Sequence, residues 1–500
     1  MNKLGEISYF IFGEWCYNFC IGNLPVTAFK INKKEYNFMK KIALLALSAV
    51  CVLALAGCNK SKGPSEAALK AAENGDYSKL PVAKNPATKK AYDFGGMAVT
   101  LYDWWSNPDA PAGSKAEEDR RAWQKYLMET YNFTYKEDNL GAGWDGHPSA
   151  VSEYCMTGGD DARILLVDGR SAFAGLAANL WADISKVPDI DWTKSKWNKA
   201  VLNSMPGYSF RTGMPEPRMC VFWNKRILQE NGFDPDLPYD LQKEGKWTWE
   251  KFEELCKALT KDTDNDGIID QYALSGYHQM FAWPAVYSNG GTIVNVGSDG
   301  KYYLDMSDNT LEAWEYTRNM FINYNKPATE GNNSWNYFMA DFVNGETAFY
   351  NNEEYDAQAG GLLADMKDDW GMVCFPTGPK GDGKYFTLNN DHMLIIPSIY
   401  PQDKVNKILK IYDIITDSVP GYDDPDSWKE SYYASFRDSR AVDETMQFMM
   451  DNSKPYIDWL VPGLDCRPLA WNICGGADVA ETYESMKNSL QGVIDEAMNK

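Results

Sequence analysis

The stretch "DTDNDGIIDQ", residues 262–271, gathers several carboxylates into one short loop. Its spacing resembles that of a calcium-binding loop, in which alternate acidic positions, one backbone carbonyl and a later carboxylate supply oxygens to the ion. The ligands that this pattern predicts are Asp262, Asp264, Asp266, Ile268 through its carbonyl, and Asp270. The glutamate that completes an EF-hand at position twelve is absent, because Ala273 stands there. A structural calcium site and a metal-free acidic turn both remain open.

Other residues that could support chemistry lack the required spacing. The stretch "GAGWDG", residues 141–146, fits a dinucleotide-binding GxGxxG pattern, but a polar strand precedes it and Trp144 would crowd the turn. The three histidines, His147, His278 and His392, show no metal-binding spacing, and HExxH, GxSxG and P-loop motifs are absent. Acidic pairs are numerous, so spacing alone leaves a glycosidase that uses two carboxylates as an alternative.

Strands alternating with helices must position these residues. The segment "VTLYDWW" alternates like a strand, and "ARILLVDG" is continuously apolar, as expected for a strand that is buried on both faces. Ser114 with Glu117 forms a capping box before one helix, and Thr248 precedes another whose apolar residues follow helical spacing. This alternation predicts an α/β fold with a parallel sheet.

Composition narrows the class of protein. The chain has 500 residues, too many for one ordinary domain, and 44% are apolar, which is enough for sizeable cores. Its net charge of −21 argues against a nucleic-acid partner, which needs a basic surface, and against attraction to anionic lipid. Aromatic residues are abundant at 14%; they serve either the core or stacking on the apolar faces of sugars.

The N-terminal region predicts export. Lys40 and Lys41 precede the apolar run 42–55, which is too short to span a bilayer and ends in "LAGC" at Cys58. This series resembles a bacterial lipoprotein signal, residues 39–57, with Cys58 as the lipidated residue. Residues 1–38 lie upstream of it, and we expect them to be an over-long translated start and not a domain. We therefore expect a protein of the cell envelope that is held at a membrane through its lipid anchor.

The remaining cysteines predict no metal cluster. Cys155, Cys220, Cys256, Cys374, Cys466 and Cys474 include no CxxC pair. Export permits disulfides, but the spacing alone assigns no pairing.

Seven segments, in this order, resemble the extracellular solute-binding lipoproteins of carbohydrate ABC transporters, the family that includes maltose-binding protein. They cover about residues 95–415 and read "VTLYDWW", "TGGDDARILLVDGRSAFAGLAANLWADIS", "VFWNKRILQENGFDPD", "WTWEKFEELCKALT", "FAWPAVYSNGG", "MADFVNGETAFYNN" and "WGMVCFPTGPKGDG". Trp223 stands where the family has tyrosine.

The resemblance implies a two-lobed, periplasmic-binding-protein-like α/β fold of type II, with a hinge and lobes built from discontinuous segments. We expect an upstream extension and signal peptide at residues 1–57, a tether at 58–93, the first lobe at 94–222 and 370–415, and the second lobe at 223–369 and 416–500. Ligands of such folds bind where strand ends and helix N-termini meet between the lobes.

The resemblance also implies a ligand site built from rings for stacking on sugar faces, and from amides and charged groups for hydroxyls. Its residues would be Trp104, Trp105, Asp168, Arg170, His278, Gln279, Trp283, Tyr350, Asn351, Asn352, Arg467 and Trp471. One of the first two tryptophans, and Trp283, could equally be core residues. Some relatives close a shortened calcium loop with its ninth and tenth residues, here Asp270 and Gln271, and the single neutral oxygen of Gln271 implies weak affinity.

Together these patterns predict a monomeric receptor subunit of an ABC importer that binds a sugar, passes it to a membrane permease and catalyses no reaction. It requires no cofactor, although a structural Ca²⁺ ion remains open at the acidic loop. The alternatives are a surface glycosidase or lyase, and the same fold with a peptide or an acidic oligosaccharide as ligand.

Overall fold

The computed structural model describes residues 70–71, 74–332, 334, 336–358, 360–389, 392–422, 428–433 and 435–498. All of these described residues belong to one compact unit. The predicted signal peptide and Cys58 lie outside the described residues. Within the described part, no helix combines the length and the apolar character needed to cross a membrane.

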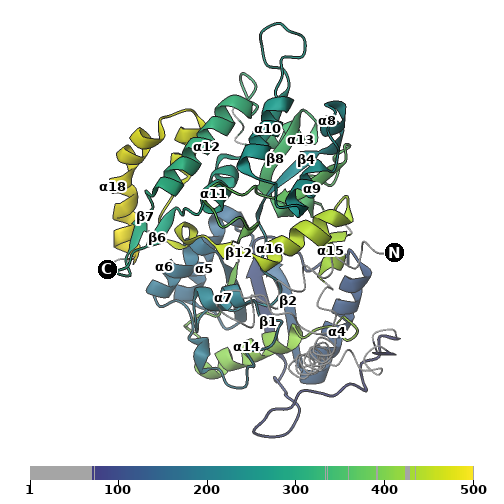
Figure 1. The fold of residues 1–500 in the computed structure, drawn as a ribbon. Helices are drawn as coiled ribbons and strands as arrows, with labels where there is room; N and C mark the ends of the chain where they lie inside the picture. The colour runs from purple at the N-terminus through teal and green to yellow at the C-terminus, as the bar shows by residue number, and fades with distance from the viewer. Residues whose placement is uncertain are drawn as a thin grey trace, which may run out of the picture. The chain divides into compact units, whose positions relative to one another are not determined.

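The helices and strands alternate along the chain, as the sequence predicts (Figure 1). In chain order they are β1 (Met97–Asp103), α4 (Lys115–Tyr131), β2 (Phe133–Asn139), α5 (Gly143–Thr157), β3 (Ala162–Val167), α6 (Gly169–Ala177), η1 (Ile184–Lys186), α7 (Lys199–Ser204), β4 (Met219–Asn224), α8 (Lys225–Glu230), α9 (Leu237–Lys243), α10 (Trp249–Leu259), β5 (Tyr272–Gly276), α11 (His278–Ser288), β6 (Val294–Val296), β7 (Tyr302–Leu304), α12 (Asp308–Tyr324), α13 (Tyr337–Val343), β8 (Thr347–Glu353), η2 (Glu354–Ala357), β9 (Trp370–Cys374), β10 (Thr387–Asn389), β11 (Met393–Ile395), α14 (Gln402–Ile415), α15 (Lys429–Tyr433), η3 (Ala441–Met446), α16 (Gln447–Asp451), β12 (Ser453–Pro455), η4 (Ile457–Leu460), α17 (Arg467–Cys474) and α18 (Val479–Met498).

The first lobe is built on a four-stranded sheet with the order β11-β3-β1-β2. β1 runs parallel to β2 and β3, while β11 joins the edge of β3 in the antiparallel direction. The predicted helix start at Ser114 is confirmed, because its side chain accepts a hydrogen bond from the backbone N–H of Glu117. The Glu117 carboxylate reaches back to the N–H of Gly113, so the cap satisfies two donors at the helix start.

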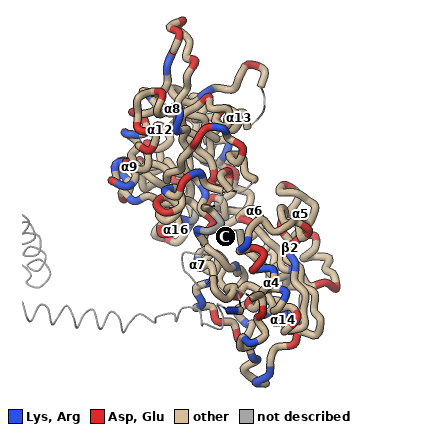
Figure 2. The backbone as a smooth tube through the Cα atoms, turned by 90° about the vertical axis from the view of Figure 1, so that its right-hand side faces the viewer, with Lys and Arg blue, Asp and Glu red and all other residues tan. Residues whose placement is uncertain are grey.

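The second lobe is built on a separate four-stranded sheet with the order β5-β8-β4-β9. β4 pairs antiparallel with both β8 and β9, and β5 runs parallel to β8. Thr248 caps α10 as predicted, and the apolar stripe of that helix, Phe252, Leu255, Cys256 and Leu259, is buried. Each sheet has its own hydrophobic core. In Figure 2 the helices α4, α5 and α14 of the first lobe lie together, apart from α8, α9, α12 and α13 of the second.

The structure moves one predicted lobe boundary. Residues 370–374 were expected in the first lobe, but they form β9 and pair with β4 of the second lobe, where Asn224 lies opposite Trp370. The chain returns to the first sheet only at Met393. The strand is buried along its whole length, and such an apolar run shows no preference for one sheet over another in its sequence.

The predicted tether also ends earlier than residue 93. Tyr77 is buried in the first core, where its ring packs edge-on against Trp123 at 5.0 Å between ring centroids. Further along, the backbone N–H of Ala83 donates to the hydroxyl of Tyr131 over 2.6 Å. The polar composition of this segment concealed the few residues that attach it to the lobe. From Tyr77 onward the segment is part of the first lobe.

Two chain segments cross between the lobes beside each other and form a hinge. Isolated bridges join Phe210 to Leu394 and Pro217 to Asn389 in the antiparallel direction. The first segment leads from the first lobe into β4, and the second leads from β10 back into β11.

Replacing Tyr77 tests whether this early segment stabilises the first lobe. Tyr77→Ala should lower the free energy of unfolding by about 3 kcal/mol, since it removes a buried ring from a packed core. Tyr77→Phe is the matched control. Within the described part, the Tyr77 hydroxyl is buried without a hydrogen-bond partner, so its removal should cost nothing. Urea unfolding curves measure both variants, and equal stability of Tyr77→Ala and wild type would contradict this role.

Candidate ligand-binding site

Two tryptophans follow β1 at the end of the first sheet, and the structure gives them different roles. Trp104 is half-buried and packs edge-on against three rings, those of Trp105, His147 and His392, at 4.9–5.0 Å between centroids. Trp105 is 50% exposed. The buried carboxylate of Asp103 fixes the turn, because it accepts the backbone N–H of Trp105 over 2.9 Å. Trp104 therefore supports Trp105, which presents a ring to solvent.

Asp168 and Arg170 follow β3 and bind each other. Asp168 is buried at the N-cap of α6, and its carboxylate lies 2.6 Å from the Arg170 guanidinium. That guanidinium stacks 3.6 Å from the ring centroid of Trp144 and donates to the Trp144 carbonyl. Trp144 is 42% exposed, so the pair predicted to bind ligand instead holds a further exposed ring in place. The sequence analysis considered Trp144 only as a residue that argues against a dinucleotide site.

In the second lobe, His278 begins α11 and Gln279 is buried beside it. The His278 ring stacks on Phe321 at 5.3 Å, and burial lowers its pKa to about 4, so the imidazole is neutral near pH 7. Trp283, on the same helix, is only 1% exposed, and its indole N–H donates to Asp458 over 2.6 Å. Trp283 is a core residue with no face open to a ligand, which corrects the predicted stacking role.

Tyr350, Asn351 and Asn352 lie just before the end of β8, and two of them are used internally. The Tyr350 hydroxyl donates to Asp356 over 2.7 Å, and the Asn352 amide donates to the same carboxyl oxygen over 2.6 Å. Burial raises the pKa of Asp356 to about 6. Asn351 points to the other face of the sheet and is buried, and neither atom of its amide has a hydrogen-bond partner in the described part of the chain.

Asn351 lies directly opposite Gly276, the last residue of β5, and the chain continues from there to His278. The Nδ1 atom of His278 is also buried without a partner among the described residues. A buried polar group without a partner costs about 1–3 kcal/mol. At this end of the sheet, the side chains of Asn351 and His278 would therefore gain most in free energy by forming hydrogen bonds with a hydroxyl-bearing ligand.

Arg467 and Trp471 both lie on α17. Arg467 forms two hydrogen bonds of 2.8 Å with Asp465. Trp471 is 50% exposed, with its ring centroid 6.1 Å from that of His278. The structure thus gives the predicted arginine an internal partner and brings the predicted tryptophan next to the start of α11.

The hinge carries a charged cluster that the sequence analysis did not identify. The carboxylate of Glu216 lies 2.5 Å from the Arg211 guanidinium, 2.8 Å from that of Arg218 and 2.8 Å from Nδ1 of His392. Burial alone would raise the pKa of Glu216, but the charges of these neighbours hold it well below its usual range. The sequence did contain a signal for this cluster, namely the alternation of basic and acidic residues in "RTGMPEPR". This segment crosses between the lobes at the hinge.

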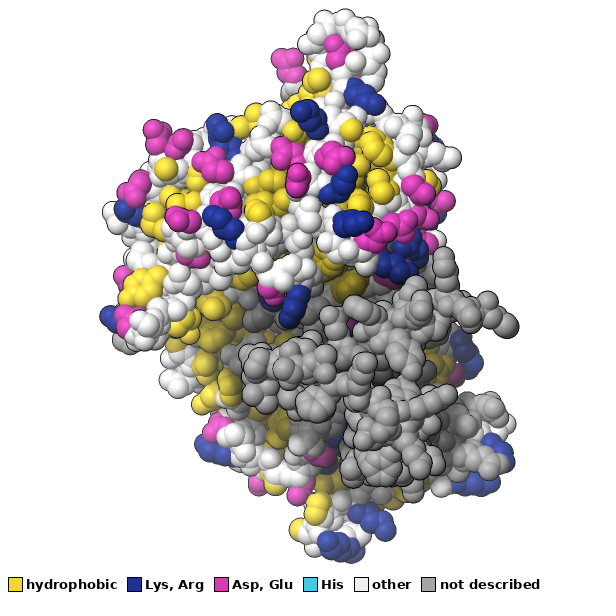
Figure 3. Space-filling view, viewed as in Figure 1, with side chains coloured by type: hydrophobic (Ala, Val, Ile, Leu, Met, Phe, Trp, Pro, Cys, Tyr) yellow, Lys and Arg dark blue, Asp and Glu magenta, His cyan; other side chains and the backbone are white. Residues whose placement is uncertain are grey.

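A cavity of about 410 Å³ opens beside Trp105 in the first lobe. Its polar lining includes Asp103, Arg120, Gln124, Glu137, Arg211 and Asp417. On the face of the second lobe seen in Figure 3, acidic and basic side chains are interspersed, with no continuous basic surface of the kind that binds nucleic acid.

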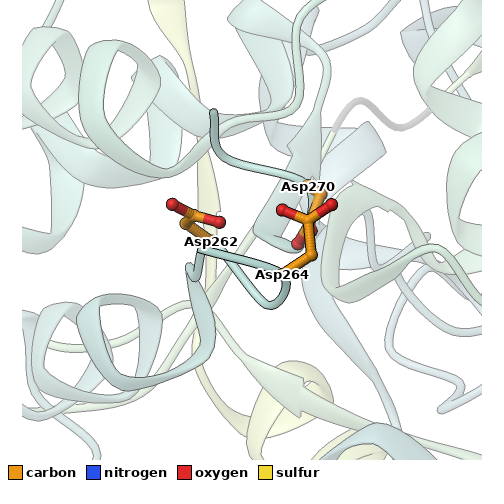
Figure 4. Close-up of side chains that lie close together, drawn as sticks. All are labelled: Asp262, Asp264 and Asp270. Atoms are coloured by element: carbon orange, nitrogen blue, oxygen red, sulfur yellow. The ribbon is translucent and has the colours of Figure 1, made fainter. Parts of the chain in front are cut away.

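The acidic loop follows α10 and extends away from the second sheet (Figure 1). Carboxylate oxygens of Asp262, Asp264 and Asp270 lie within 4.8 Å of one another (Figure 4). Asp266 instead accepts the N–H of Ile268, and the Gln271 amide donates to the carbonyl of Leu259. Three of the predicted ligands thus lie close enough together to share a cation, Asp266 is not among them and Gln271 binds the backbone, so the calcium site stays a prediction.

A two-lobed α/β structure, with rings and polar groups at the ends of both sheets and a hinge between them, defines a solute-binding protein. Residues 141–405, more than half of the chain, match the model of the bacterial extracellular solute-binding proteins, and the chain belongs to that family. Members of this family are extracellular, so this is an exported protein of the cell envelope. No curated protein matches the chain in sequence.

Solved structures share the fold at low sequence identity. The cyclic alpha-maltosyl-1,6-maltose binding protein of Arthrobacter globiformis has a TM-score of 0.57 and 14% identity, over 80% of this chain and 100% of its own. UgpB of Mycobacterium tuberculosis, in complex with glycerophosphocholine, has a TM-score of 0.57 and 16% identity, over 80% and 99%. The substrate-binding protein Lmo0181 of Listeria monocytogenes, in complex with cycloalternan, has a TM-score of 0.55 and 15% identity, over 80% of this chain and 98% of its own.

The acidic loop predicts a calcium-dependent melting temperature. An ion between Asp262, Asp264 and Asp270 would offset their mutual repulsion, so calcium should raise the melting temperature and a chelator should reverse the rise. Asp264→Asn should abolish the shift. Asp266→Asn, whose side chain lies outside the triad, should retain it. Differential scanning calorimetry with and without calcium measures this, and a wild-type curve unaffected by calcium would identify a metal-free turn.

Asp458 predicts a pH dependence of stability. It is buried beneath Trp283, and burial raises its pKa to about 7, whereas an unfolded aspartate titrates near 3.8. From pH 4 to 7 the unfolded chain therefore loses this proton while the folded chain keeps it. Across that window, the contribution of Asp458 to the free energy of unfolding falls by an amount on the order of 4 kcal/mol. Above the window the contribution is constant.

Asp458→Asn removes the titration but keeps an oxygen to accept the Trp283 N–H. The variant should lose less stability between pH 5 and pH 8 than the wild type, as measured by urea unfolding at both pH values. Parallel losses in the two proteins would show that Asp458 is not the titrating group.

Proposed function

We propose that this protein binds a sugar or oligosaccharide between its two lobes and delivers it to the membrane permease of an ABC importer, without chemical change. The observation that carries the proposal is a set of exposed indole rings held by fixed partners: Trp105 against Trp104, Trp144 on Arg170, and Trp471 beside His278.

Rings of this kind suit a sugar because its C–H faces are apolar and gain from burial against an aromatic surface. Hydroxyl groups lose water when the ligand is enclosed and need hydrogen-bond partners. Asn351 offers a donor and an acceptor, and the neutral His278 ring offers one further site. This combination of rings and neutral polar groups favours a hydroxyl-rich ligand.

Two structures of the same fold carry saccharides in their names, cycloalternan and cyclic maltosyl-maltose, which supports a sugar. The glycerophosphocholine in a third makes a polar phosphodiester the second ligand class to test. Catalysis is not part of the proposal, and two carboxylates near the exposed rings, Asp103 and Asp168, already bind the backbone of Trp105 and the side chain of Arg170.

Lipidation of Cys58 and association with permease subunits complete the proposed role. The basic and apolar series before Cys58 supports the anchor. Cys58→Ser should release the protein from membranes, and the receptor itself is expected to be a monomer.

Replacing exposed tryptophans tests the proposed site. Trp105→Ala and Trp471→Ala should each weaken binding about tenfold, or 1.4 kcal/mol, because each removes one stacking surface. Isothermal titration calorimetry with a panel of mono- and oligosaccharides, and with glycerophosphocholine, measures the affinity.

The matched control is Tyr303→Ala. This exposed ring lies on β7, in the small β6-β7 sheet outside both four-stranded sheets, and its hydroxyl donates to Asp299, so its loss should leave affinity unchanged. If no saccharide binds, or if a bound one is cleaved, the proposed function is wrong. Preferential binding of glycerophosphocholine would replace the sugar with the second ligand class.

A further inference from the structure

Two cysteines face each other in the second sheet. Cys220 in β4 and Cys374 in β9 are register partners on neighbouring antiparallel strands, and both are fully buried. Direct partners project to the same face of a sheet, so the two side chains leave the sheet on the same side.

The hydrogen-bond pattern shows what kind of pair this is. The backbone N–H of Lys225 donates to the carbonyl of Asp369, so this pair, immediately beyond the strands, is hydrogen-bonded. Antiparallel pairs alternate between hydrogen-bonded and non-hydrogen-bonded. Counting back along the register makes Cys220–Cys374 a non-hydrogen-bonded pair, and the Cys374 N–H accordingly donates to the side chain of Gln242 instead.

Non-hydrogen-bonded pairs bring the strands closest, with Cα atoms about 4.5 Å apart and side chains nearer than in the alternate pairs. A disulfide spans Cα atoms about 4.4–6.8 Å apart. The backbone therefore lies within the range of a bond. Each thiol now turns to a carbonyl, Cys220 to Asn352 and Cys374 to Thr445, so closing the bond requires rotation of the two side chains and no strand movement.

We propose that Cys220 and Cys374 form a cross-strand disulfide in the exported protein. The chain belongs to an extracellular family, and disulfides form in such compartments. The oxidant is another disulfide. One cysteine thiolate attacks it, releasing a thiol and leaving a mixed disulfide; the second thiolate then displaces the remaining thiol. The two cysteines together lose two protons and two electrons, and the oxidant becomes two thiols.

The bond forms before the sheet closes. In the folded protein, burial raises the pKa of both thiols, so the reactive thiolate is scarce and no oxidant reaches it. Once formed, the bond is protected from reduction by the same burial. The bond would join β4, the strand that enters the second lobe, to its neighbour β9. It would thereby close residues 220–374 into one covalent loop. A loop of this length restricts the unfolded chain strongly.

The test is a peptide map of the full-length chain. The protein is refolded with reduced and oxidised glutathione, its free thiols are trapped by alkylation under denaturing conditions, and it is digested with trypsin. We expect peptides 219–225 and 368–380 to be linked, and to separate after reduction. Recovery of both peptides fully alkylated would overturn the proposal.

Thermal unfolding provides the second measurement. Reduction during refolding should lower the melting temperature of the wild type by several degrees. Cys220→Ala and Cys374→Ala should be insensitive to reductant, whereas Cys256→Ala, which removes another buried thiol, should keep the wild-type response. Equal sensitivity in all four proteins would overturn the pairing. Neither outcome depends on the ligand, so a failure here leaves the proposed sugar binding intact.

Discussion

The carboxylate of Glu216 is the constraint on which the arrangement of the site depends. Two chain segments cross between the lobes, and they bring Arg211, Arg218 and His392 to one place. Without a central anion the two guanidinium groups would repel one another in a largely buried setting, and removing one member of such a cluster typically costs about 3–5 kcal/mol. One acidic side chain therefore holds the hinge strands side by side.

The effects of this cluster reach both lobes. The His392 ring packs against Trp104, which in turn supports the exposed ring of Trp105. On the other side, a guanidinium nitrogen of Arg218 lies 3.9 Å from Glu353, the last residue of β8. The rings of Trp104 and Trp105 in the first lobe and the end of β8 in the second lobe thus both contact the same charged cluster at the hinge. A change in hinge geometry would move both parts together.

Local signals predicted the elements well, and tertiary packing decided what the sequence left open. Ser114 and Thr248 mark helix starts because capping depends on residues within one turn. The roles of Trp144 and Trp283 could not be separated in this way. What distinguishes these two tryptophans is distant in the sequence: Arg170 holds Trp144 at the surface, while Asp458 binds the buried Trp283. The sheet to which β9 belongs could not be predicted for the same reason, because β4, the strand with which it pairs, is distant in the sequence.

The pairing of charges at the site bears on the choice of ligand. Asp168 is neutralised by Arg170, and Arg467 by Asp465, so these charged groups are already engaged before any ligand arrives. An anionic ligand would have to break one of these two pairs to gain the guanidinium of Arg170 or of Arg467. A neutral ligand would meet indole rings and the uncharged groups of Asn351 and His278 at no such cost. At these two positions the paired charges therefore agree with the proposed neutral, hydroxyl-rich solute better than with a phosphate or a uronic acid.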